Sequence, residues 1–134
     1  VWVDGMKSPL QRLAESWNFE TMDILLMLAP LSSVNHFHGL GDFTMDQLGR
    51  LSRRSEKNVA PFSYMGISIV NPAVFADAPD GAFSLNWAYD RAIKSNRLYG
   101  AVHDGLWYHI STPADLELAR NRFINGHSPP VPFF

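Results

Sequence analysis

The sequence has no cysteine, which excludes disulfide bonds and zinc sites built on thiolates. It has no excess of basic charge either, because 11 lysines and arginines stand against 13 aspartates and glutamates. A chain with this charge balance lacks the positive electrostatic field of a nucleic-acid-binding domain, so we predict no nucleic-acid partner. The longest apolar run, residues 24–29, is much shorter than the about 20 residues that cross a bilayer. No basic segment followed by a long apolar one opens the sequence. We therefore expect a cytoplasmic protein without a membrane partner.

A nucleotide-binding glycine motif is also missing. The one glycine cluster, residues 39–41, does not lie between a predicted strand and a predicted helix, where phosphate-binding loops occur. The sequence opens without methionine on the apolar stretch of residues 1–3, as if a strand had been cut. We therefore interpret the 134 residues as the C-terminal part of a longer protein.

The clearest local pattern lies near the C-terminal end. Residues 106–110 are apolar and aromatic, which predicts a buried strand that ends near His109. Thr112, Pro113 and Asp115 then form an N-cap, a first helical position and a capping-box carboxylate. Because ligands bind at the carboxyl ends of strands in open α/β sheets, His109 is a candidate site residue. A core histidine bonded to the backbone is the alternative. The helix is expected to bury one face, formed by Leu116, Ala119 and Phe123.

The rest of the chain alternates between helical and strand patterns. Ser8-Pro9 predicts the start of a short amphipathic helix, and residues 22–29 predict a strand buried on both faces. With residues 1–3 they form a predicted strand–helix–strand crossover. We further predict a hairpin over residues 43–54 that turns at Gly49 and a strand over residues 64–70. One helical turn is predicted over residues 73–76, and a helix capped by Ser84 over residues 85–93. Residues 98–102 and 106–110 are predicted to form a second hairpin.

Two groups of side chains could bind ligands. His36 and His38 are two residues apart, and with His103 or His109 they could form a zinc site of three histidines. Arg53 and Arg54 could bind a phosphate, although neighbouring residues on a strand point to opposite faces, so at most one can serve. Solvent-exposed charges at a hairpin end are the alternative for both arginines.

Several motifs together resemble those of the sugar-1-phosphate nucleotidylyltransferases, the NDP-sugar pyrophosphorylases. Trp107-Tyr108-His109-Ile110-Ser111-Thr112-Pro113 is similar to a closing motif in which an aspartate, and in some bacterial members a histidine, stands at the position of His109. Ser111 replaces the usual glycine there. Tyr64-Met65-Gly66-Ile67 resembles the family's aromatic-x-Gly-Ile strand. The order of these motifs is most similar to small bacterial members that act on mannose 1-phosphate or N-acetylmuramate 1-phosphate, over nearly the whole chain to Phe123.

This resemblance implies a fold, a reaction and a set of site residues. The fold would be the C-terminal portion of an α/β, Rossmann-like nucleotide-diphospho-sugar transferase domain, a mixed sheet flanked by helices. Residues 1–123 would be its sugar-phosphate-binding part and residues 124–134 a proline-rich extended tail. The reaction would join an NTP to a sugar 1-phosphate, with Mg²⁺ as cofactor and the N-terminal half of the same enzyme as partner. The substrate-binding residues implied are Asp42, Arg54, Tyr64, Gly66, Asn86 and Trp107.

His109 would stand at the family's second metal position, where a neutral imidazole is a poor ligand for the oxygen-preferring Mg²⁺. It could instead contact a phosphate or a metal-bound water. The Glu56-Lys57 pair stands near the place where many family members carry a sugar-phosphate lysine. Two other functions stay open at this point: a non-catalytic binding or regulatory module related to the family, and a zinc hydrolase.

Overall fold

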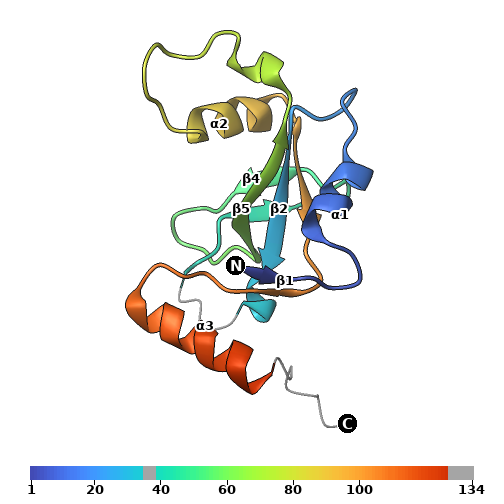
Figure 1. Ribbon diagram of the computed structural model, residues 1–134. Coiled ribbons are helices and arrows are strands. Elements are labelled where there is room, and N and C mark those ends of the chain that lie inside the picture. The colour runs from blue at the N-terminus through green and yellow to red at the C-terminus, as the bar shows by residue number, and fades with distance from the viewer. Residues whose placement is uncertain (35–38, 127–134) are drawn as a thin grey trace.

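The computed structural model describes residues 1–34 and 39–126 and shows a mixed α/β arrangement (Figure 1). Five strands form one sheet in the order β4-β3-β5-β2-β6, in which β2 is antiparallel to β5 and parallel to β6. They are β2 (Ile24–Pro30), β3 (Phe43–Met45), β4 (Leu51–Arg53), β5 (Phe62–Val70) and β6 (Leu98–Val102). A separate two-stranded ribbon pairs β1 (Trp2–Val3) with β7 (Leu106–Trp107). The helices are α1 (Pro9–Ser16), α2 (Asn86–Lys94) and α3 (Pro113–Asn125), with 3₁₀ turns η1 (Leu31–Ser33) and η2 (Pro72–Phe75). The predicted α/β class with a mixed sheet is confirmed at this level.

Strand β2 is the centre of the molecule, and its residues from Ile24 to Ala29 are all buried. Side chains alternate between the two faces of a strand. Ile24, Leu26 and Leu28 accordingly pack with residues of α2 and the β3–β4 hairpin. Leu25 and Met27 pack on the other face with residues of α1 and β7. The prediction of a strand buried on both faces is confirmed.

Figure 1 shows how the helices are distributed around this strand. Helix α2 lies at the end of the sheet where β2 begins, whereas β1 and α3 lie at the end where β2 finishes. Helix α1 lies beside the sheet, and Leu13 on its inner face is buried in the cluster with Leu25. None of the helices in residues 1–34 and 39–126 is long and apolar enough to cross a membrane.

Local sequence signals account for most element boundaries. The Ser8 hydroxyl accepts a hydrogen bond from the Gln11 backbone N–H, and Pro9 opens α1. The predicted hairpin forms β3 and β4, with Gly49 at a φ of +85° in the turn. The predicted turn of helix is η2. Helix α2 begins at Asn86 with Leu85 at the N-cap position, one residue after the predicted Ser84, whose hydroxyl accepts from the Asn86 N–H. These interactions lie within a few residues of one another, which is why the sequence predicts them.

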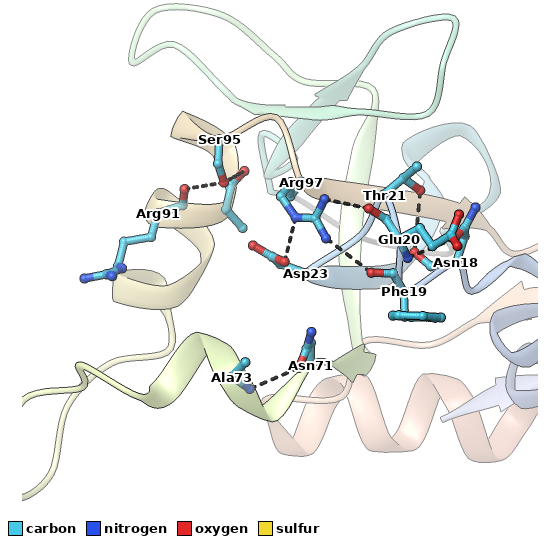
Figure 2. Close-up of polar contacts among 11 residues, drawn as sticks. Asn18, Phe19, Glu20, Thr21, Asp23, Asn71, Ala73, Arg91, Ser95 and Arg97 are labelled. Carbon is cyan, nitrogen blue, oxygen red and sulfur yellow. Dashed lines mark hydrogen bonds and ion pairs between the residues drawn. The ribbon is translucent and has the colours of Figure 1, made fainter.

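The start of β2 is joined to β6 by a polar cluster (Figure 2). The Arg97 guanidinium donates through Nε to the Asp23 carboxylate at 2.7 Å and through its terminal nitrogens to the carbonyls of Glu20 and Phe19. The Asp23 backbone N–H donates to the Arg97 carbonyl, and the Asp23 carbonyl accepts from the Asn71 N–H. Asp23 therefore connects β2 to the segments that carry β6 and β5.

The predictions for the two ends of the chain were wrong in their strand partners. Residues 1–3 do not join the central sheet as a crossover strand, and residues 98–102 and 106–110 do not form a hairpin, because β1 pairs with β7. The predicted strand over residues 106–110 is only β7, which ends at Trp107. The close approach of the two segments explains the pairing: a Cβ on Gly105 would lie 2.1 Å from the Val3 carbonyl oxygen. Gly105 thus lets the chain leave β6 and pass along β1.

His103 holds this junction together. Its side chain is 2% exposed, and its Nε2 lies 3.1 Å from the Val3 carbonyl oxygen and 3.2 Å from that of Leu106. Because both neighbours are acceptors, Nε2 must carry the proton. The salt bridge from Arg12 of α1 to Asp104, at 2.7 Å, lies beside it. His103 is therefore a core histidine bonded to the backbone, whereas His109 is exposed.

Gly100 allows a second close approach, between β6 and the tip of the β3–β4 hairpin. The Gly100 N–H donates to the Gly49 carbonyl at 2.9 Å, and Arg50 forms a bridge with Tyr99. A Cβ on Gly100 would lie 2.9 Å from a methyl carbon of Leu51 in β4. The outer side of β6 is thus partly covered by the hairpin tip, which local sequence patterns do not reveal.

Helix α3 has the predicted N-terminus but not the predicted burial. Thr112 and Asp115 form the capping box, and the helix continues to Asn125, two residues into the stretch expected to be an extended tail. Ala119 is buried, but Leu116 is 37% exposed and Phe123 48% exposed. The Phe123 ring packs against that of Tyr108, with the ring centres 5.6 Å apart. Residues 127–134 lie outside the described residues.

We expect the His103→Phe substitution to destabilise the fold by about 1–3 kcal/mol, because the carbonyls of Val3 and Leu106 would lose their buried donor. The free energy of unfolding in urea measures this effect. The matched control is His109→Phe, at an exposed position, for which we expect a change within about 0.5 kcal/mol. A smaller loss for His103→Phe than for the control would contradict this role.

The Asp115 carboxylate predicts a pH dependence of α3. The backbone N–H of Ser111 and the Thr112 hydroxyl and N–H lower the pKa of Asp115 below its ordinary value. A carboxylate with a depressed pKa stabilises the fold above its unfolded pKa, and this stability is lost as the pH falls through the folded pKa. We therefore expect α3 to lose helical circular dichroism below about pH 4. In Asp115→Asn that decrease should be weaker, and an unchanged acid profile would contradict the assignment.

Candidate functional site

The carboxyl ends of β2 and β6, the parallel pair, point to one end of the sheet, where ligands bind in open α/β folds. η1 and Val34 follow β2 there, and His103 and the β1–β7 ribbon follow β6. Val34 forms a parallel bridge with Trp107, so the segments that leave both strands meet. The start of β5 lies at the same end, because Pro30 pairs with Phe62. This end of the sheet is the candidate functional site.

Trp107 and His109 are neighbours at this end. Trp107 is 5% exposed and packs in the cluster that contains Met65 and Leu13. The rings of Trp107 and His109 lie 5.6 Å apart in an edge-to-face arrangement, and His109 itself is exposed. The buried Trp107 indole thus packs against the exposed His109 imidazole, which follows the end of β7.

Asp42 and Arg54 organise the second part of the site. The Asp42 carboxylate accepts hydrogen bonds from the Ser63 hydroxyl at 3.0 Å and from the Tyr64 N–H at 2.8 Å, and its carbonyl accepts from the Arg54 N–H. Arg54 donates through one terminal nitrogen to the carbonyls of Ser55, Glu56 and Asn58. These contacts hold the turn that carries the exposed Lys57. The proposed substrate contacts of Asp42 and Arg54 stay predictions beside this positioning role.

Tyr64 lies on the face of the sheet covered by α2, and Asn86 is the first residue of that helix. Arg53 bonds the Asp90 carboxylate at 2.6 Å and the Asn86 side-chain oxygen at 3.2 Å, and its guanidinium lies 5.7 Å from the Phe43 ring centre. Arg53, which we had considered for phosphate binding, therefore ties β4 to α2. The Tyr64 ring meets that of Tyr89 edge to face at 6.0 Å, and its hydroxyl lies 3.3 Å from the Ser68 hydroxyl. Tyr64 and Trp107 thus pack on opposite faces of the sheet.

Gly66 forms a bulge in β5. Between the pairs Leu26–Ser68 and Leu28–Tyr64, β5 advances by four residues while β2 advances by two. Gly66 has a φ of +83°, a region that side chains with a Cβ rarely adopt. A Cβ built on Gly66 would have no atom within 4 Å, so the surface above the bulge is open. Strand β5 therefore contains a bulge at Gly66, and the space above it is accessible.

Metal ligands do not gather among the described residues. His36 and His38 lie outside them, and residues 1–34 and 39–126 contain no group of three or more acidic or histidine side chains that could hold an ion. His103 uses Nε2 for the Val3 and Leu106 carbonyls, and its Nδ1 is buried without a partner among the described residues. His109 offers a nitrogen ligand, whereas Mg²⁺ prefers oxygen. This part of the chain therefore does not by itself fit a magnesium centre.

Sequence reasoning missed two features of this region. His103 carries no local signal, because its two acceptors come from Val3 and Leu106, of which the first is 100 residues away. The pairing of Arg53 with Asp90 joins positions 37 residues apart. Only the folded chain brings these groups together.

Comparison with known proteins gives a clear relative. No family model matches the chain. Over 113 residues, which are 84% of this chain, it is 33% identical to N-acetylmuramate alpha-1-phosphate uridylyltransferase of Caulobacter vibrioides. The chain spans about half the length of that relative, 47% of it. The resemblance seen in the motifs is thereby confirmed: this chain is homologous to part of a sugar-1-phosphate nucleotidyltransferase.

Proposed function

We propose that the chain is the sugar-phosphate-binding, C-terminal part of an enzyme that makes an NDP-sugar and pyrophosphate from an NTP and a sugar 1-phosphate. The observation that carries this proposal is the 33% identity over 113 residues to the uridylyltransferase. Residues 1–123 would form part of a Rossmann-like nucleotide-diphospho-sugar transferase domain, and the tail would follow α3. N-acetylmuramate α-1-phosphate is the first sugar phosphate to test, because the relative is named for it.

The proposed reaction requires little covalent work from the protein. A phosphate oxygen of the sugar 1-phosphate attacks the α-phosphorus of the NTP, the bond from that phosphorus to the bridging oxygen breaks, and pyrophosphate leaves. Such a transfer is accelerated mainly by alignment of the reactants and by stabilisation of negative charge. Residues that hold the sugar phosphate in place therefore supply part of the catalysis even when they do not react.

On the α2 face, Tyr64, Gly66 and Asn86 would contact the sugar. The open surface above the Gly66 bulge supports this, because a sugar ring can approach the backbone there. Asp42 fixes the backbone of Tyr64, and Arg54 fixes the turn of Lys57. We propose that this turn presents Lys57 to the sugar phosphate, with Arg54 acting as a positioning residue.

At the end of the β1–β7 ribbon, Trp107 and His109 would contact the phosphate side of the substrates. Mg²⁺ is the cofactor that the family resemblance implies, but the described residues do not fit a site for it. We therefore propose that His109 bonds a substrate phosphate or a water molecule. The buried Trp107 ring restricts the positions available to the imidazole.

A non-catalytic binding module is the second candidate. It is favoured by the lack of a metal-ligand group among residues 1–34 and 39–126. The experiment that separates the two adds the part of the Caulobacter enzyme outside the match to this chain, with UTP and N-acetylmuramate α-1-phosphate. Pyrophosphate release by the mixture supports the enzyme, whereas sugar-phosphate binding without release supports the module. We expect no release by the 134-residue chain alone.

We expect His109→Ala to weaken binding of the sugar 1-phosphate to the chain by about ten- to 150-fold, the loss of one hydrogen bond to a charged group. Its melting temperature should stay unchanged, because His109 is exposed. Isothermal calorimetry and thermal unfolding measure the two effects. Arg120→Ala, an exposed position on α3, is the control and should bind normally. Equal affinity of both variants would remove His109 from the site.

A further inference from the structure

A cleft of about 500 Å³ lies at the end of the sheet where β2 begins, whereas the β1–β7 ribbon lies at the other end. It is bounded by α2 on one side, by η2 on the other and by Asp23 between them. Its volume falls within the roughly 300–1000 Å³ of small-molecule sites. Because it shares no residue with the site described above, it does not depend on the proposed function.

Small side chains on both walls create this space. Ala88 and Ala92 are four residues apart and so lie on one face of α2, and both line the cleft. Ala73 and Val74 of η2 lie across from them. A short apolar floor of this kind accepts the C–H surface of a small ligand.

Two cations lie on the same cleft, at the last turn of α2. Lys94 is exposed and forms no ion pair or hydrogen bond with any described residue. Arg91 stacks on the Trp87 ring at 4.6 Å, which fixes its guanidinium, and pairs with Asp77 at 3.3 Å. The Asp77 side chain is 79% exposed, and such exposed pairs are weak, so a ligand anion can replace it.

The end of α2 does not need these cations as caps. Its last carbonyls accept from the backbone N–H groups of Ser95, Asn96 and Arg97, and the Ser95 hydroxyl donates to the carbonyls of Arg91 and Ala92. Lys94 and the guanidinium of Arg91 therefore remain available to an anion in the cleft.

Asp23 supplies the complementary acceptor. Its Oδ1 accepts from Arg97 at 2.7 Å, which balances the carboxylate charge, while Oδ2 has no partner among the described residues. Figure 2 shows Asp23 between the end of α2 and the segment of Asn71 and Ala73, with Arg97 on its other side. An oxygen placed in this way accepts a hydrogen bond from a ligand hydroxyl without repelling the ligand's anionic group.

We propose that this cleft binds a small hydroxylated oxyanion, a phosphate or carboxylate on a short hydroxylated carbon chain. The oxyanion contacts Arg91 and Lys94, a hydroxyl donates to Asp23, and the carbon chain lies on Ala88 and Val74. The three kinds of contact match three chemical parts of one ligand, and each comes from a different part of the cleft wall.

The test uses the 134-residue chain with glycerol 3-phosphate and D-glycerate as probes, followed by backbone amide shifts in ¹H–¹⁵N spectra. We expect saturable shifts at Ala73, Ala92 and Ser95 with at least one of the two probes. The phosphate and carboxylate arms show which oxyanion is preferred. Glycerol alone and inorganic phosphate alone should each bind at least tenfold more weakly. No saturable shift with either probe, or shifts confined to residues around Gly66, would overturn the proposal.

Two pairs of variants separate binding from folding. The double variant Lys94→Ala/Arg91→Ala should bind the probe at least tenfold more weakly. The control variant Arg120→Ala should bind it as the unchanged chain does. Ala73→Leu should fill the cleft and weaken binding similarly, whereas Ala76→Leu, outside the cleft lining, should not. Thermal unfolding of each variant confirms that it is folded. If the double variant Lys94→Ala/Arg91→Ala and the variant Ala73→Leu both bind the probe with unchanged affinity, the probe binds elsewhere and the proposal is overturned.

Discussion

Burial of β2 on both faces is the constraint on which the rest of the structure depends. Each face of this strand needs its own apolar cover, because an exposed face of Leu, Ile and Met side chains costs free energy in water. Helix α2 and the β3–β4 hairpin supply one cover, and α1 with the β1–β7 ribbon supplies the other. The two ends of the sheet are thereby fixed, and with them the two places where a ligand can reach polar groups.

The two ends differ in how their polar groups are held. At the carboxyl end of β2, the side chains of Asp42 and Arg54 form hydrogen bonds to backbone groups. These bonds hold β5 and the turn that carries Lys57. At the amino end, the Asp23–Arg97 pair connects β2 to β6, and the cations of α2 lie beside it. In both places a polar pair that stabilises the fold also sets the position of the more exposed groups. This explains why structural and binding roles are hard to separate from residue type alone.

The homology and the structure support different parts of the functional argument. Identity to the uridylyltransferase over most of the chain shows that the chain is homologous to part of a sugar-1-phosphate nucleotidyltransferase. The structure adds local geometry: the bulge at Gly66, the indole under His109 and the junction at His103. Among residues 1–34 and 39–126, no three acidic or histidine side chains gather into a group that could hold a metal ion.

The sequence alone determined the elements whose causes are local. The Ser8 and Thr112 caps, the Gly49 turn and the apolar run of β2 depend on neighbours within a few residues, so their patterns predicted the structure correctly. Tertiary structure decided the partners: β1 beside β7 in place of β2, His103 in place of His109 in the core, and α3 largely exposed. Those outcomes depend on close approaches, such as Gly105 against Val3, between segments about 100 residues apart. A periodic pattern records which face of a segment is apolar, but not which distant segment covers it.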